Sequence, residues 1–245
     1  MSMATTDLYH HTSRRFNEEL ERVRSKVLSM GGLVEAQLGK CLAALAQGQG
    51  VVGQSVVAGE RQVNAMEVSI DEDCIRILAT RGPAAGDLRL IIATIKTITD
   101  LERIGDECEK IGMIAPRLAL AERSTDGYRA VRHLGRAVQS MVHDALDACA
   151  RLDWELALRT ARADRLVDEE YKAIRRQCVS FMLKDPQDIP RALDVMWIVR
   201  ALERIGDHAK NVCEYVIYVV HGQDIRHLPR TDLEHWLVGS ANSRR

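Results

Sequence analysis

The hexapeptide "LERIGD" occurs twice in the chain, as residues 101–106 and again as residues 202–207. Each copy places a glycine, Gly105 or Gly206, inside a pattern whose apolar residues recur at the spacing of an α-helix. A glycine in a helix interior costs about 1 kcal/mol relative to alanine. Because the chain carries this cost twice in the same local sequence, we interpret the two copies as parts of an internal repeat.

Two further pairs of segments repeat at nearly the same separation. "MGGLVEAQL" at 30–38 aligns with "LGRAVQSMV" at 134–142, and "ERQVNAME" at 60–67 aligns with "DRLVDEEY" at 164–171. Between these segments, clusters of glycine and proline interrupt the chain, as they do where helices end. The pattern therefore predicts three long helices in each half of the chain, in the same order.

The predicted fold is all-α, with two tandem three-helix bundles. We expect the first repeat at residues 8–122, the second at 128–222 and a loosely ordered C-terminal tail at 223–245. In the third helix of each repeat, apolar residues spaced by three and four predict the core-facing stripe. The two stripes are Leu101, Ile104, Cys108 and Ile111, and Ile198, Leu202, Ile205, Ala209, Val212, Val216 and Val219.

Composition narrows the class of protein. Lys and Arg together number 34 and Asp and Glu 35, so the formal net charge of −1 gives no electrostatic reason to expect a nucleic-acid partner. The longest apolar run near the end of the chain is six residues, whereas a membrane-spanning helix needs about 20. We therefore expect a cytoplasmic protein that is not integral to the membrane. The six cysteines form no CxxC pair, and we expect buried, reduced thiols.

Each LERIGD copy also carries a pair of acidic residues four positions apart. Glu102 and Asp106 form one pair, and Glu203 and Asp207 form the other. Residues at this spacing share a helix face, where like charges destabilise a helix by roughly 0.2–0.5 kcal/mol. These residues also lie one position beyond the core stripe, where they can meet acids on a neighbouring helix.

The second helix of each repeat has the same spacing. Glu60 is followed by Asn64, and Asp164 is followed by Asp168. Carboxylates converging from two helices make an oxygen-rich site for a hard cation. Since histidine and cysteine are absent from these positions, zinc is disfavoured, and we expect iron, manganese or magnesium.

Other interpretations of the same residues remain open. The acids can belong to a solvated, salt-bridged face, and Gly105 and Gly206 can simply be packing glycines. A metal-free structural adaptor is therefore an alternative. A carboxylate-bridged metalloenzyme is a second one, but no Glu-x-x-His pair of the kind found in di-iron bundles is present. We expect a protein that is not an enzyme.

Six segments together match a known pattern: both LERIGD copies, "MGGLVE", "NAMEVSIDEDCIRILATRGPAAGDLRL", "DEEYKAI" and "EYVIYVVHGQDIRH". Through them the chain resembles the PhoU family of accessory regulators of phosphate-specific transport. The resemblance implies a cytoplasmic homodimer that restrains phosphate uptake and the phosphate-starvation (Pho) regulon. It also implies two partners, the phosphate-sensing histidine kinase and the ATPase of the phosphate ABC transporter.

The resemblance also implies a metal motif, in which an acidic residue is followed four positions later by Asp. In this chain the motif falls on Glu102 and Asp106, Glu203 and Asp207, and Asp164 and Asp168, whereas Glu60 and Asn64 depart from it. Because Asn64 brings no charge, we expect metal to occupy the second half in preference to the first.

Overall fold

The structure is a computed structural model that describes residues 14–47, 52–120 and 125–225. Within these ranges it consists of α-helices and one short 3₁₀ turn, so the predicted all-α class is confirmed. The elements are α1 (Arg14–Gln47), α2 (Val52–Arg81), α3 (Ala85–Leu120), α4 (Thr125–Arg151), α5 (Trp154–Lys184), η2 (Pro186–Asp188) and α6 (Ile189–His221).

The helices reproduce the repeat seen in the sequence. Moving along the chain by 104 residues takes the end of α1 to the end of α4, and a shift of 101 takes the end of α3 to the end of α6. Both helices that carry LERIGD are thus the third of their half. Residues 8–13 and 121–122 of the predicted first repeat lie outside the described residues. The same holds for the predicted tail beyond residue 225.

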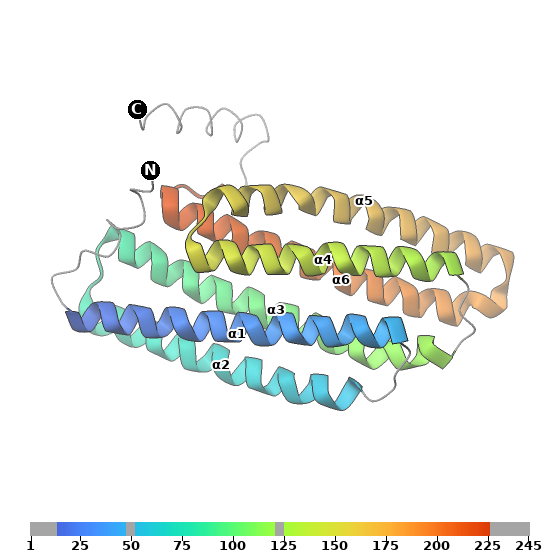
Figure 1. Cartoon of the computed structure of the whole chain (residues 1–245), viewed down its shortest axis with the longest axis horizontal. Coiled ribbons are helices and arrows are strands. Elements are labelled where there is room, and N and C mark those ends of the chain that lie inside the picture. The colour runs from blue at the N-terminus through green and yellow to red at the C-terminus, as the bar shows by residue number, and fades with distance from the viewer. Residues whose placement is uncertain (1–13, 48–51, 121–124, 226–245) are drawn as a thin grey trace, which may run out of the picture.

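The two halves lie side by side along the long axis of the molecule (Figure 1). Helices α1, α2 and α3 pack against one another, as do α4, α5 and α6, and α3 packs extensively against α6 along the seam between the halves. The two seam helices run antiparallel, since Asp100 of α3 contacts His208 of α6 while Arg117 contacts Asp194. Helix α1 also contacts α4 across the same seam.

Both predicted core stripes are confirmed. The residues of the α3 stripe are at most 1% exposed, and those of the α6 stripe at most 4%. Burial of these side chains is the main source of helix stability, because long helices gain more from packing an apolar face than from intrinsic propensity. Glycine ends the last helix, where Gly222 adopts a φ of 76° that favours glycine.

The cysteines are free, and five of the six are buried, as expected. Cys149 differs because it is only half-buried. Among the described residues, no helix is both long enough and apolar enough to cross a bilayer.

Two acidic clusters at equivalent positions

Three carboxylates converge between α2 and α3, and we call Glu60, Glu102 and Asp106 the first acidic cluster. One oxygen from each lies within 4.8 Å of the others. Glu60 comes from α2 and is only 6% exposed, whereas the other two come from α3 and are half-buried. Sequence spacing placed Glu102 and Asp106 on one face, and the helix packing adds Glu60 to them. Asn64 is exposed one helical turn beyond Glu60.

Gly105 makes this approach possible. A Cβ atom at Gly105 would lie 2.7 Å from Oε2 of Glu60, closer than real Cβ atoms come to such a neighbour. The same Cβ would lie 3.5 Å from Oε1 of Gln37, a residue of α1. The glycine therefore lets a buried carboxylate rest against the backbone of α3, at the cost in helix propensity noted above.

Buried polar atoms around Glu60 lack partners. Within the described residues, neither carboxylate oxygen of Glu60 has a partner at hydrogen-bond geometry, and neither do Oε1 and Nε2 of Gln37. The amide of Asn64 is close enough to favour the ionised form of Glu60, but it does not meet that geometry. Gln37 is 3% exposed. Such unsatisfied groups cost about 1–3 kcal/mol each, and more when charged. A carboxylate cluster with unpaired buried oxygens fits a hard divalent cation, which would supply the missing interaction.

The charges in the cluster perturb each other. Burial, and next the charge of Asp106, raise the pKa of Glu60 to about 7, although the amide of Asn64 opposes the shift. Burial and the charge of Asp106 also raise the pKa of Glu102. Ionising Glu60 beside the other two carboxylates is therefore unfavourable near neutral pH in the absence of a cation.

This pKa gives a stability prediction. A carboxyl group whose pKa is higher in the folded than in the unfolded state favours folding most at low pH, and the benefit is lost as pH rises. For Glu60 the loss runs from about pH 4.5 to about pH 7. It amounts to roughly 3–4 kcal/mol in the free energy of unfolding, at about 1.4 kcal/mol for each pH unit.

The Glu60→Gln variant tests this prediction. In chelator-containing buffer at pH 7.5 it should be more stable to urea than the parent, and the stability difference should shrink towards pH 4.5. Glu18→Gln, which alters an exposed carboxylate on α1, is the matched control and should change little. A Glu60→Gln variant no more stable than the parent at pH 7.5 would show that the ionised Glu60 carboxylate does not destabilise the fold.

The equivalent position between α5 and α6 holds the second acidic cluster, Asp164, Asp168, Glu203 and Asp207. Asp164 is 5% and Glu203 9% exposed, whereas Asp168 is half-buried and Asp207 exposed. Gly206 again marks the close approach of the helices, since a Cβ there would lie 3.3 Å from Val167 and 3.6 Å from Oδ1 of Asp164.

Basic side chains pair with three of these four acids. Lys210 Nζ donates to Asp164 at 2.9 Å, Arg200 contacts both oxygens of Glu203 at 3.1 Å, and Lys172 lies 3.8 Å from Asp168. Burial and Asp207 raise the pKa of Glu203 while Arg200 opposes the shift. Partial desolvation of its carboxyl group, followed by the charge of Asp164, raises the pKa of Asp207. The sequence-predicted residues thus divide into two clusters with different charge balance, and metal binding stays a prediction.

Two buried carboxylates of the α3–α6 seam, Asp100 and Glu107, are not among the site residues predicted from the sequence. Glu107, which is 3% exposed, lies 3.0 Å from Arg204 and 2.9 Å from Lys110. His208 and Asn211 both contact Asp100, at 2.6 and 3.0 Å. Asn211 thus contacts α3 through its side-chain amide. Acidic residues close to the core stripe were the available signal for Asp100 and Glu107.

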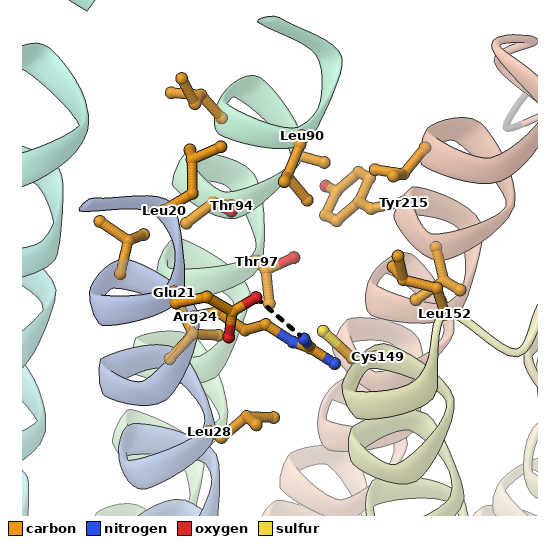
Figure 2. A pocket seen from close by; sticks show the side chains of 16 residues that line it. Leu20, Glu21, Arg24, Leu28, Leu90, Thr94, Thr97, Cys149, Leu152 and Tyr215 are labelled. Carbon is orange, nitrogen blue, oxygen red and sulfur yellow. Dashed lines mark hydrogen bonds and ion pairs between the residues drawn. The ribbon is translucent and has the colours of Figure 1, made fainter. Parts of the chain in front are cut away.

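An apolar groove opens between the halves, near the start of α1 and the end of α6 (Figure 2). Leu20 and Leu90 line one side, and Tyr215 and Leu152 line the other. Arg24 reaches from α1 across the groove and donates to the backbone carbonyl of Ala150. The enclosed volume is only about 60 Å³, whereas small-molecule sites usually measure roughly 300–1,000 Å³. The groove is therefore a poor site for a charged metabolite.

Comparison with known proteins identifies relatives over nearly the whole chain. The PhoU domain model matches residues 27–115 and 131–216, one match in each half. The phosphate-specific transport system accessory protein PhoU homolog of Pseudomonas putida is 52% identical, covering 90% of this chain and 86% of its own. The PhoU accessory protein of Escherichia coli K12 is 42% identical, covering 97% of this chain and 98% of its own.

Solved structures agree with these sequence relatives. The crystal structure of PhoU from Pseudomonas aeruginosa has a TM-score of 0.82 at 51% identity and covers 85% of this chain and all of its own. The phosphate transport system regulatory protein PhoU from Streptococcus pneumoniae has a TM-score of 0.78 at 28% identity, covering 85% of this chain and 98% of its own.

Proposed function

Because the chain belongs to the PhoU family, we propose that it is a phosphate-transport accessory protein, one that restrains phosphate uptake and the Pho regulon when phosphate is plentiful. The observation that carries this proposal is the match of both repeats to relatives named as phosphate-specific transport accessory proteins. Coverage above 95% of both chains in the Escherichia coli comparison supports carrying the role over to the whole chain.

The proposed mechanism is docking rather than turnover. Its partners are the phosphate-sensing histidine kinase and the ATPase of the phosphate ABC transporter, and the working form is a cytoplasmic homodimer. Long helices with charged residues on their outer faces support this mechanism, since electrostatic complementarity at such surfaces selects partners and speeds their encounter. A metal-free structural adaptor is the second candidate, and the paired charges of the second acidic cluster favour it.

Metal binding at the first acidic cluster is part of the proposal. Glu60, Glu102 and Asp106 would hold a magnesium, manganese or iron ion, and the side-chain carbonyl of Gln37 lies beside the same Gly105 position as Glu60. The ion would neutralise three mutually repelling carboxylates. It would thereby stabilise the packing of α2 on α3 and fix the shape of the surface they share.

Co-purification tests the docking proposal. The tagged full-length chain, recovered from phosphate-rich cells without chelator, should bring down both the kinase and the transporter ATPase, as identified by mass spectrometry. Because docking through charged helix faces is screened by salt, recovery should fall as the salt concentration of the wash rises. A tagged helical protein of similar size from the same cells is the control. Recovery of neither partner would refute docking and leave the structural adaptor as the preferred function.

A further inference from the structure

The two acidic clusters occupy equivalent positions but contain different neighbours. Lys210 of α6 corresponds to Glu109 of α3 under the 101-residue shift that relates the LERIGD copies. Gln37 of α1 corresponds to Met141 of α4 under the 104-residue shift. The second half therefore places the cationic Lys210 near its acids, whereas the first half places Glu109 and the buried amide of Gln37 there.

The ammonium group of Lys210 lies where a bound cation would balance the second acidic cluster. Its Nζ donates to Oδ2 of Asp164 at 2.9 Å, and the Asp164 side chain is only 7% exposed. Burial, the largest single effect, lowers the pKa of Lys210, but the hydrogen bond to Asp164 and the charges of Asp164, Glu214 and Asp207 together outweigh it, so the net shift is upwards. The lysine thus stays charged at neutral pH. It also acts on Asp207, where it opposes the rise in pKa.

A divalent cation would have to displace this lysine. Asp164 would exchange a short charge-assisted hydrogen bond for the metal, while the ammonium group remained nearby and repelled the ion. Arg200 would add to the repulsion, because it already contacts both oxygens of Glu203. The residues of the second acidic cluster therefore do not fit a metal ion in this chain.

The first acidic cluster has the opposite character. Among the described residues, Glu60 has no ion pair and no donor at hydrogen-bond geometry, although the Asn64 amide favours its charged form, and Glu109 adds further negative charge nearby. The nearest cation in an ion pair with the cluster is the exposed Arg103, 3.5 Å from Glu102. The buried side-chain amide of Gln37 also has no partner at hydrogen-bond geometry. Both Gln37 and Glu60 lie beside Gly105, since a Cβ atom there would be 3.5 Å from Oε1 of Gln37 and 2.7 Å from Oε2 of Glu60.

We propose that the two clusters are neutralised by different means, the first by a divalent cation and the second by the built-in ammonium group of Lys210. This inference rests on the metal-binding part of the proposed function. It reverses the occupancy expected from the sequence, which favoured the second half because Asn64 lowers the charge of the first. In this chain the pseudo-symmetric repeat has one metal-dependent half and one metal-independent half.

Counting bound Mn²⁺ in chelator-stripped protein at pH 7.5, by calorimetry and by electron paramagnetic resonance of free Mn²⁺, tests the proposal. The parent should bind one ion per chain. Lys210→Met should bind two, because it removes the ammonium group and keeps the length of the side chain. Lys110→Met is the matched control, since Lys110 also contacts a buried carboxylate, Glu107, at 2.9 Å. It should still bind one ion.

The reciprocal change keeps the test decisive if Lys210→Met folds poorly. Glu109→Lys places an ammonium group at the equivalent position of the first half and should abolish Mn²⁺ binding, with an unchanged far-UV circular dichroism spectrum. The proposal is overturned if folded Lys210→Met binds no more Mn²⁺ than the parent, or if Glu109→Lys keeps the parent's site. Neither result affects docking, which co-purification measures separately.

Discussion

The Leu202→Asp variant should not accumulate as a folded protein. Leu202 lies in the second LERIGD copy and is completely buried in α6, where it packs into the core between the halves. Removing a buried leucine side chain costs about 2–5 kcal/mol, and placing an unpaired carboxylate there costs several kcal/mol more. The sum is comparable with the total stability of a typical domain, roughly 5–15 kcal/mol. Soluble yield and thermal unfolding followed by circular dichroism measure the effect.

Leu166→Asp is the matched control. Leu166 lies on α5 and is 62% exposed, so the same chemical change should alter stability by less than about 1 kcal/mol. If Leu202→Asp instead melts within a few degrees of the parent while Leu166→Asp unfolds it, the assignment of the α6 core stripe is wrong. The comparison isolates burial, because both residues lie in the interior of long helices of the same half.

The core was predictable because helix periodicity is a local property. The spacing of Ile198, Leu202 and Ile205 determines which face of the helix is apolar, and that face must be buried for a long helix to be stable. Glycine and proline between the apolar segments likewise gave the helix order. The packing of α3 against α6 depends on contacts between residues about 100 positions apart, such as Asp100 with His208. Periodicity within each helix does not encode those contacts.

The site was predictable only in part, for the same reason. The four-residue spacing placed Glu102 beside Asp106, and the repeat pointed to Glu60 on the neighbouring helix. Which acids meet a cation depends on the direction in which long side chains extend between helices. The position of Lys210 in the sequence does not distinguish it from other basic residues such as Arg204, whereas the structure joins it to Asp164 at 2.9 Å. Gln37 was not identified, although a polar residue one turn from the buried Val34 was a usable signal.

Deleting the gene is expected to leave the phosphate-starvation genes expressed when phosphate is plentiful, at the level reached under starvation. This follows from the proposed function, because docking of the protein would favour the state of the histidine kinase in which the phosphate-starvation genes are repressed. A bound protein shifts the equilibrium between two states of its partner only by its difference in affinity for them. Without that protein, the partner returns to the populations of the two states that it has when unbound. Loss of the protein should therefore end repression, and the cells should take up and store excess phosphate. Reporter expression and total cellular phosphate measure both effects.

Complementation separates the folded protein's role from indirect effects of the deletion. The parent chain should restore repression, and so should the stable Leu166→Asp variant, whereas Leu202→Asp should fail because it does not supply a folded surface. A deletion strain that represses these genes normally in high phosphate would contradict the regulatory role. Full repression by Leu202→Asp would show that the helical surfaces described above are not what the partners bind. If one protein docks to both the kinase and the transporter ATPase, two results are expected together. Repression should require a folded bundle, and the deletion strain should also lose control of phosphate uptake.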